Sequence, residues 1–218
     1  NHIENRLTWG SSYAYFEICN NYIEEIGSSQ VYPLRITYLQ TTPGGTNLIS
    51  NNTIYSTTSS SSYSYGIYFQ NISNGQNLVI VNNYIKIENS YTTSYARQAI
   101  YSNNMSNALV ANNYWYSYSG FSSGFTGSSL VDNGTSSVNW TYNSTTGVLT
   151  SGSNMGLDQI EYRDINNTRN DIGTSGGPHA WSNYNTTTGK AAVFNLELPF
   201  QLYIGGNHNI KAKGFHKN

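Results

Sequence analysis

The sequence is poor in charged residues, in cysteine and in long apolar runs. Only 10% of its 218 residues are charged and the formal net charge is −1, whereas about 25% of an average soluble domain is charged. A nearly neutral chain offers no electrostatic surface for nucleic acid or for an anionic membrane, so we expect neither partner. No apolar run approaches the roughly 18 residues of a transmembrane helix. The single cysteine, Cys19, excludes an internal disulfide framework, and we expect it to be a small buried side chain.

The residues that take the place of charge are Tyr, Asn, Ser, Thr and Gly. Aromatic residues make up 14% of the chain and 20 residues are Tyr, which differs from the aromatic-poor, highly charged composition of disordered chains. Tyr, Thr, Val and Ile favour strands, whereas Asn, Gly and Ser favour turns. The composition therefore predicts an all-β fold. Because the sequence opens with "NHIENRLTW" and not with Met, we expect it to be a piece of a longer protein.

Pairs of asparagines recur through the first half of the chain at steps of 31, 31 and 30 residues. A weaker recurrence joins Ile36, Ile67 and Ile100, so that each period holds three short apolar segments. Repeats of 20 to 50 residues built from short strands indicate a solenoid or a propeller. The pairs are Asn20-Asn21, Asn51-Asn52, Asn82-Asn83 and Asn112-Asn113.

The absence of hairpin signals favours a solenoid. A propeller blade needs antiparallel hairpins, and no Asn-Gly or Asp-Gly pair separates strands within the repeats. In a parallel β-helix, equivalent residues of successive coils lie about 4.8 Å apart. Asparagine tolerates the left-handed backbone of a sharp corner, and stacked asparagine amides can bond to one another along the stack. The eight paired asparagines are therefore predicted to form a structural ladder at a corner.

The stretch "LVIVNNYIKI" predicts which side chains face the interior. After the corner, Ile85 and Ile87 are expected to point inward and Lys86 outward. Before it, the alternation separates Leu78 and Ile80 from the valines beside them, but does not say which face is interior.

The pattern apolar-x-apolar-x-Asn-Asn-x-Ile resembles the repeats of right-handed parallel β-helix proteins, the superfamily of pectate lyases, tailspikes and many secreted bacterial surface proteins. The resemblance implies about four coils of about 31 residues over residues 1–120. An irregular last coil and a closing segment would follow over residues 121–181, with Trp140 and Tyr142 packing on the stack. Residues 182–218 would form a C-terminal strand or hairpin.

The stretch "LDQIEYRDINNTRNDIGTSGGPHAW" resembles a segment that closes β-helix domains in secreted bacterial proteins. This resemblance implies a closing element without an active site. We expect Arg169 to form an ion pair with an aspartate of this turn. A weak alternative is a calcium-binding loop, because oxygen-bearing side chains alternate as they do in such loops. Its ligands would be Asp164, Asn166, Thr168 and Asn170.

Six apolar residues alternate with other side chains in the tail and predict a half-buried strand or two strand pieces that break near Pro199. A turn at Gly205-Gly206 and a second strand through Ile210 and Ala212 would complete a hairpin. Such a hairpin needs a surface to cover. The six residues of this assembly tail are Phe194, Leu196, Leu198, Phe200, Leu202 and Ile204.

The sequence offers no catalytic residues that we could assign. The charged residues of the repeats are few and share no register, although Glu24 and Lys86 occupy equivalent positions and could form a surface pair. The four histidines lack the spacing of metal ligands. Aromatic rings can cover the apolar faces of sugars. The densest aromatic patch, and the candidate sugar contact, is Tyr114, Trp115, Tyr116 and Tyr118.

Two functions remain open. The first is a non-catalytic extracellular structural or adhesive β-solenoid, secreted or on the cell surface, which associates head to tail through its C-terminal tail. The second is a fragment of a polysaccharide lyase or glycoside hydrolase, or a carbohydrate-binding module, with a polysaccharide as partner. Apart from calcium, no cofactor is predicted.

Overall fold

The computed structural model describes most of the first 117 residues and parts of the remainder. The described residues are 2–11, 13–59, 61–72, 74–89, 97–102, 105, 107–117, 125–126, 132–133, 139–143, 148–159, 162, 164, 168–178, 180, 191–197 and 211–216. The chain divides into two compact units, Asn1–Ala180 and Trp181–Asn218. No helix in the described residues has the length and apolarity that a transmembrane span requires.

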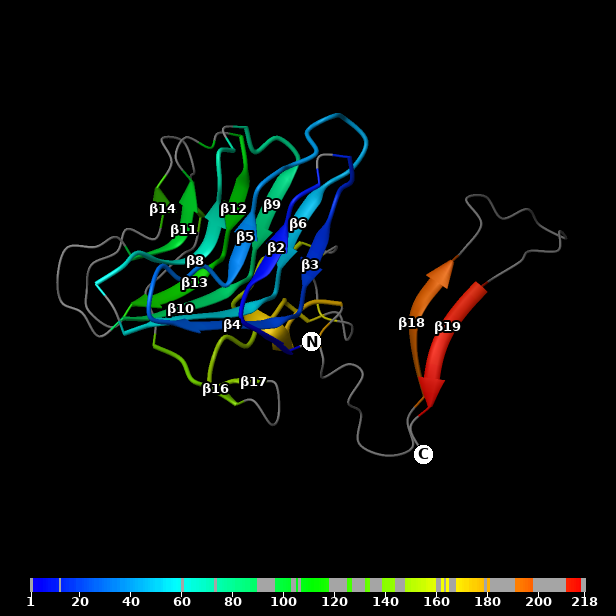
Figure 1. Cartoon of the computed structure of the whole chain (residues 1–218). Coiled ribbons are helices and arrows are strands. Elements are labelled where there is room, and N and C mark those ends of the chain that lie inside the picture. The colour runs from blue at the N-terminus through cyan, green and yellow to red at the C-terminus, as the bar shows by residue number, and fades with distance from the viewer. Residues whose placement is uncertain are drawn as a thin grey trace, which may run out of the picture. The chain divides into compact units, whose positions relative to one another are not determined.

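The first unit is an all-β parallel solenoid in which three parallel sheets are wound by one chain (Figure 1). Sheet A contains β1 (His2–Glu4), β4 (Tyr22–Gly27), β7 (Thr53–Thr58), β10 (Tyr84–Asn89) and β13 (Tyr114–Ser117). Sheet B contains β2 (Leu7–Trp9), β5 (Leu34–Ile36), β8 (Ser64–Phe69), β11 (Arg97–Ser102) and β14 (Phe125–Thr126). Sheet C contains β3 (Glu17–Cys19), β6 (Asn47–Ser50), β9 (Leu78–Val81), β12 (Leu109–Ala111) and β15 (Asp132–Asn133).

The strands pair at a register of about 31 residues, which confirms the predicted solenoid. Tyr22 pairs with Thr53, Thr53 with Tyr84, and Tyr84 with Tyr114. The three central layers, β4 to β12, form complete turns, and shorter strands extend the sheets on both sides. The expected number of about four coils therefore compares with three complete turns. Because β14 and β15 belong to sheets B and C, the stacked strands continue beyond residue 120.

The predicted register of sheet B was wrong by two residues at its first step. Leu34, not Ile36, pairs with Ile67, and Ile36 pairs with Phe69. Ile67 does pair with Ile100, as expected. The turn between β4 and β5 is shorter by two residues than that between β7 and β8, and the turn between β5 and β6 is longer by two. Because the two changes cancel, the asparagine pairs keep their spacing and hide the shift.

The interior of the solenoid is filled by aligned rows of apolar side chains, one row from each sheet. Each fully buried Ile or Leu contributes roughly 1.5–3 kcal/mol. Ile85 and Ile87 are fully buried, as predicted, and the face before the corner that points inward is that of Leu78 and Ile80. The central rows are Ile23, Ile54 and Ile85 in sheet A, Leu34, Ile67 and Ile100 in sheet B, and Ile18, Ile49, Ile80 and Val110 in sheet C.

A second, smaller core covers the outer face of sheet A. The two-stranded sheet of β16 (Tyr142–Asn143) and β17 (Val148–Leu149) and the short 3-10 helix η2 (Gly173–Ser175) belong to this covering region (Figure 1). Trp140 stacks on Tyr84 and Tyr114 at ring distances of 5.4 and 5.0 Å. Tyr142 stacks on Tyr22 at 4.3 Å, with its ring tilted by only 4°. The expectation that Trp140 and Tyr142 pack on the stack is confirmed.

The second unit contains an antiparallel hairpin of β18 (Ala191–Glu197) and β19 (Lys211–His216). Ala191 pairs with His216 and Glu197 with Lys211. The predicted hairpin is therefore present, and among the described strands β18 and β19 pair only with each other. Phe194 and Leu196 lie in β18, whereas Leu198, Phe200, Leu202, Ile204 and the turn at Gly205-Gly206 lie outside the described residues.

Candidate functional site

The second asparagine of each pair forms the predicted ladder inside the corner between sheets C and A. The amide of Asn52 donates to Asn83 Oδ1 at 3.0 Å, and that of Asn83 donates to Asn113 Oδ1 at 2.9 Å. Each of these Oδ1 atoms also accepts the backbone N–H of the asparagine one turn below, at 2.9 and 3.1 Å. Asn21 continues the row through its amide, which lies 3.2 Å from Asn52 Oδ1. Asn52 and Asn83 are completely buried, so the ladder satisfies polar groups that water cannot reach.

The first asparagine of each pair has a different role, which the sequence did not reveal. All four adopt the left-handed conformation, with φ between 51° and 59°, and this conformation makes the corner. Their side chains do not join the ladder. They bond to residues 155–176 of the closing segment. These asparagines are Asn20, Asn51, Asn82 and Asn112, and we call them the outer asparagine row.

Four contacts attach the closing segment to the outer asparagine row. The amide of Asn112 donates to the carbonyl of Met155 at 3.3 Å, and Asn82 Oδ1 accepts the N–H of Leu157 at 2.7 Å. The amide of Asn20 donates to the carbonyl of Gly176 at 2.6 Å. Asn51 donates to Asn170 Oδ1 at 2.7 Å and to the carbonyl of Asp171 at 2.8 Å. The segment therefore lies against the side of the stack, along its corner.

Within the closing segment, two predicted interactions turn out differently. Arg169 does not form the expected ion pair with an aspartate among the described residues. Its Nε donates instead to the carbonyl of Gly156 at 2.6 Å, because the turn presents a row of carbonyls that need donors. Asp164 Oδ1 accepts the N–H of Gly177 at 2.5 Å.

The candidate calcium ligands are partly engaged within the chain. Asn170 is completely buried and its Oδ1 accepts from Asn51, so that oxygen is directed at the solenoid. Asp164 lies near Thr168, whose hydroxyl is 3.4 Å from Asp164 Oδ2. Burial raises the pKa of Asp164. Asn166 lies outside the described residues. In the described part of the chain, no three His, Cys, Asp or Glu side chains gather as a metal site.

The predicted sugar-contact aromatics do not share one surface. Tyr114 is buried beneath Trp140 on the outer face of sheet A. Trp115, the next residue, points to the other side and packs against the main core. Tyr116 is half-buried, with its ring 6.0 Å from Lys86 Nζ. Tyr118 lies outside the described residues.

The charged side chains of the solenoid pair locally. Glu24, Tyr55 and Lys86 occupy one row of sheet A, which confirms that Glu24 and Lys86 are equivalent. They do not form the expected pair, because Tyr55 separates them by a full strand. Lys86 Nζ instead lies 2.6 Å from Glu88, and Arg6 lies 2.6 Å from Glu25.

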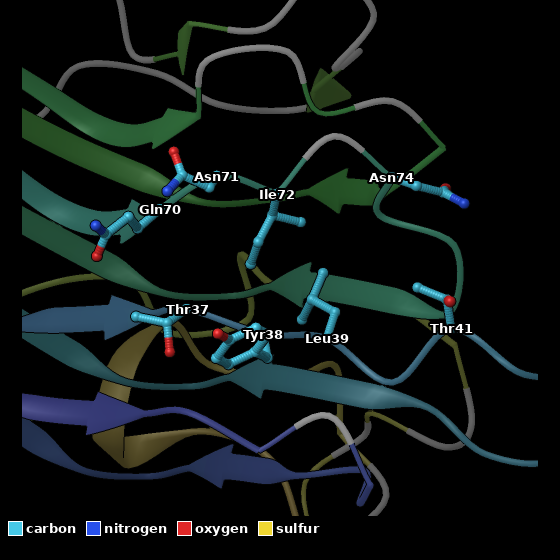
Figure 2. A pocket seen from close by; sticks show the side chains of 8 residues that line it. All are labelled: Thr37, Tyr38, Leu39, Thr41, Gln70, Asn71, Ile72 and Asn74. Carbon is cyan, nitrogen blue, oxygen red and sulfur yellow. The ribbon is translucent and has the colours of Figure 1, made fainter.

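A polar groove opens on the solenoid where the chain passes from sheet B to sheet C. It encloses about 480 Å³ between the segments that follow β5 and β8. Figure 2 shows Leu39 and Ile72 pointing toward each other, with the other side chains around them. Tyr38 is 56% exposed. None of the lining residues is charged. They are Thr37, Tyr38, Leu39, Thr41, Gln70, Asn71, Ile72 and Asn74.

A cluster of five stacked tyrosines covers part of the outer face of sheet B, and the sequence analysis missed it. Tyr65 lies 4.4 Å from Tyr101 between ring centroids, and Tyr68 lies 5.5 Å from Tyr101. The available signal was the recurrence of Tyr68 and Tyr101 at outward positions of paired strands. We call Tyr32, Tyr63, Tyr65, Tyr68 and Tyr101 the tyrosine cluster.

Cys19 is half-buried at the end of β3 and accepts a hydrogen bond from the hydroxyl of Ser50 at 3.2 Å. Burial raises the pKa of its thiol. The expected small buried side chain is therefore only partly enclosed.

These features define a parallel β-solenoid with buried stacked asparagines. Comparisons of the chain with protein-family models, with curated proteins and with solved structures find no match in any of the three.

Proposed function

We propose that this chain is a non-catalytic structural or adhesive β-solenoid that acts outside the cell and associates head to tail, with the C-terminal tail contacting the neighbouring copy. The proposal rests on the division of charge between the two units. Residues 181–218 hold four lysines and one glutamate, a formal charge of +3, whereas residues 1–180 hold six basic and ten acidic residues, a formal charge of −4. Unlike charges on two parts of one chain favour contact between copies.

The acidic residues concentrate at the first strands of the solenoid, where a neighbour could bind. Glu4 and Glu24 are register partners on sheet A, and like charges directly opposite each other are destabilising. Glu17 lies exposed in β3. In the described chain, β1, β2 and β3 are the edge strands of their sheets. A basic tail strand that docks there would neutralise the carboxylates and pair the edge.

The hairpin supports the same proposal. A two-stranded hairpin alone is marginally stable in water, so β18 and β19 gain from packing on another surface. Contacts of this head-to-tail kind propagate into filaments when the rotation between copies does not close. The extracellular location rests on the resemblance of the closing segment to that of secreted bacterial proteins.

The test compares the full chain with a chain that lacks residues 191–218, by sedimentation and electron microscopy. We expect the full chain to associate at low salt, the truncated chain to remain monomeric, and association to weaken as salt screens the charges. The double substitution Glu4→Gln and Glu24→Gln should weaken association. Glu88→Gln is the control, since Glu88 pairs with Lys86 within its own sheet. A full chain that stays monomeric at every concentration would refute the proposal.

The second candidate function is binding of a neutral polysaccharide, and the groove beside Tyr38 favours it. An exposed aromatic ring next to uncharged amide and hydroxyl groups suits a polyhydroxylated ligand without charge. A glycan array should then show retention that Tyr38→Ala abolishes and that Tyr13→Ala, which changes an exposed tyrosine elsewhere, leaves intact. A screen for unsaturated sugar products tests the lyase alternative.

A further inference from the structure

The tyrosine cluster is more closely stacked than strand pairing alone requires. Tyr68 and Tyr101 are register partners, so their proximity follows from the parallel sheet. Tyr32 and Tyr63 lie outside the strands, yet both reach the same patch, where Tyr32 lies 4.8 Å from Tyr68 and Tyr63 lies 6.0 Å from Tyr65. Four segments of the chain therefore deliver phenol rings to one place.

The local sequence of β8 explains how two of these rings reach the same face. In a regular strand, residues three apart point to opposite sides. Here a Cβ on Gly66 would lie 2.2 Å from Ile85 Cγ2, which shows that Gly66 faces the interior, and Ile67 also lies in the core. Because two consecutive residues face inward, Tyr65 and Tyr68 both lie outside, with ring centroids 5.6 Å apart. Only glycine fits at position 66.

The cluster is also placed to react with an oxidant in solution. Tyr63 is 40% exposed, and its ring contacts Tyr65, which in turn lies nearest to Tyr101. The rings of Tyr65 and Tyr101 are inclined by only 18°, and the strands that carry them are parallel. The phenol groups therefore extend in the same direction, side by side. The thiol of Cys19, whose pKa burial raises, lies on sheet C and stays protonated.

We propose that the tyrosine cluster is a site of oxidative coupling, in which a peroxidase-type oxidant using hydrogen peroxide joins Tyr65 to Tyr101. Each phenol gives up one hydrogen atom, and one hydrogen peroxide is reduced to two water molecules. The two phenoxyl radicals form a carbon–carbon bond between ring positions next to the oxygens. The ring hydrogens at those positions then move to the oxygens and restore both phenols, so that the chain loses two hydrogen atoms in total.

The product would be a covalent staple between successive turns of the solenoid. Tyr65 belongs to β8 and Tyr101 to β11, which are neighbours in sheet B. A cross-link there restricts the unfolded chain as a disulfide does, in a protein whose only cysteine cannot form an internal disulfide. The inference does not depend on head-to-tail association.

The experiment treats the full chain with a peroxidase and hydrogen peroxide at a dilution where sedimentation shows a monomer. We expect dityrosine fluorescence in the monomer, and a cross-linked peptide pair containing Tyr65 and Tyr101 that has lost two hydrogen atoms. Tyr101→Phe and Tyr65→Phe should each remove that peptide and most of the fluorescence. Tyr13→Phe is the matched control, because Tyr13 is 92% exposed and has no ring contact among the described residues.

Circular dichroism checks that each variant remains folded, and Tyr63→Phe, outside the coupled pair, should slow the reaction without changing its product. The stacked pair of Tyr22 and Tyr142, at 4.3 Å, provides the competing outcome. Coupling found only there, or undiminished coupling in Tyr101→Phe, would overturn the proposal. So would a reaction that yields only links between chains.

Discussion

The side-chain amides of Asn51 and Asn170 form a reciprocal pair, although 119 positions separate the two residues. Asn51 Nδ2 donates to Asn170 Oδ1 at 2.7 Å, and Asn170 Nδ2 lies 3.4 Å from Asn51 Oδ1. Both residues are almost completely buried. The pair fastens the closing segment to the corner of the solenoid, so part of the repeat's asparagine content serves a segment outside the repeat.

A double-mutant cycle on this pair should show strong coupling. Asn51→Ala and Asn170→Ala each leave a buried amide without its partner, so the double variant should be more stable than the sum of the single changes predicts. We expect a coupling free energy of about 1–2 kcal/mol, measured by urea unfolding. Asn170→Ala combined with Asn74→Ala, which is exposed, should instead be additive. Additive behaviour of Asn51 with Asn170 would show that the pair contributes nothing specific.

Asn83→Ala should be one of the most destabilising single substitutions in the solenoid. The Asn83 side chain donates to the carbonyl of Ile49 at 3.0 Å and accepts the N–H of Asn52 at 2.9 Å. Removing it leaves buried donors and acceptors unsatisfied on two turns, at a cost of about 3 kcal/mol in the free energy of unfolding. Chemical denaturation provides the measurement, with Asn74→Ala as the control. A cost equal to that of the control would contradict a structural role for the ladder.

Asp164 should make stability depend on pH. Burial raises its pKa in the folded state above the ordinary value of 3.8, so its contribution is most favourable below 3.8 and is lost as pH rises through the raised pKa. Asp164→Asn keeps an acceptor for the N–H of Gly177. It should therefore raise the urea midpoint near neutral pH and have little effect below pH 3.8. An equal effect at both pH values would show that titration of Asp164 does not contribute.

Cys19 should react slowly with thiol reagents in the folded protein. Its thiol is half-buried, and burial raises the pKa, which lowers the fraction of reactive thiolate. Alkylation by iodoacetamide, followed by mass spectrometry, should be much faster in denaturant than in buffer. Ser50→Ala removes the hydrogen bond that the thiol accepts, and should slow alkylation further because that bond favours the thiolate. Equal rates in the folded and denatured states would contradict the burial of this thiol.

Several features of the fold could be predicted because they repeat at every turn. The steps of 31, 31 and 30 residues follow from stacking, since each strand must pair in register with the strand one turn away. The inward direction of Ile85 and Ile87 and the polar ladder follow from the same periodicity. The hairpin of β18 and β19 was predictable from local alternation.

The sequence by itself thus determined the solenoid, its period, its corner and its core, because each is a local pattern that repetition amplifies. Only the tertiary structure decided which asparagine of a pair makes the ladder and which holds the closing segment, since both roles suit the same residue type. It also decided that Ile36 lies beside Phe69 and that four segments bring five tyrosines together. These outcomes depend on turn lengths and on contacts between distant segments, and no single period of the sequence contains them.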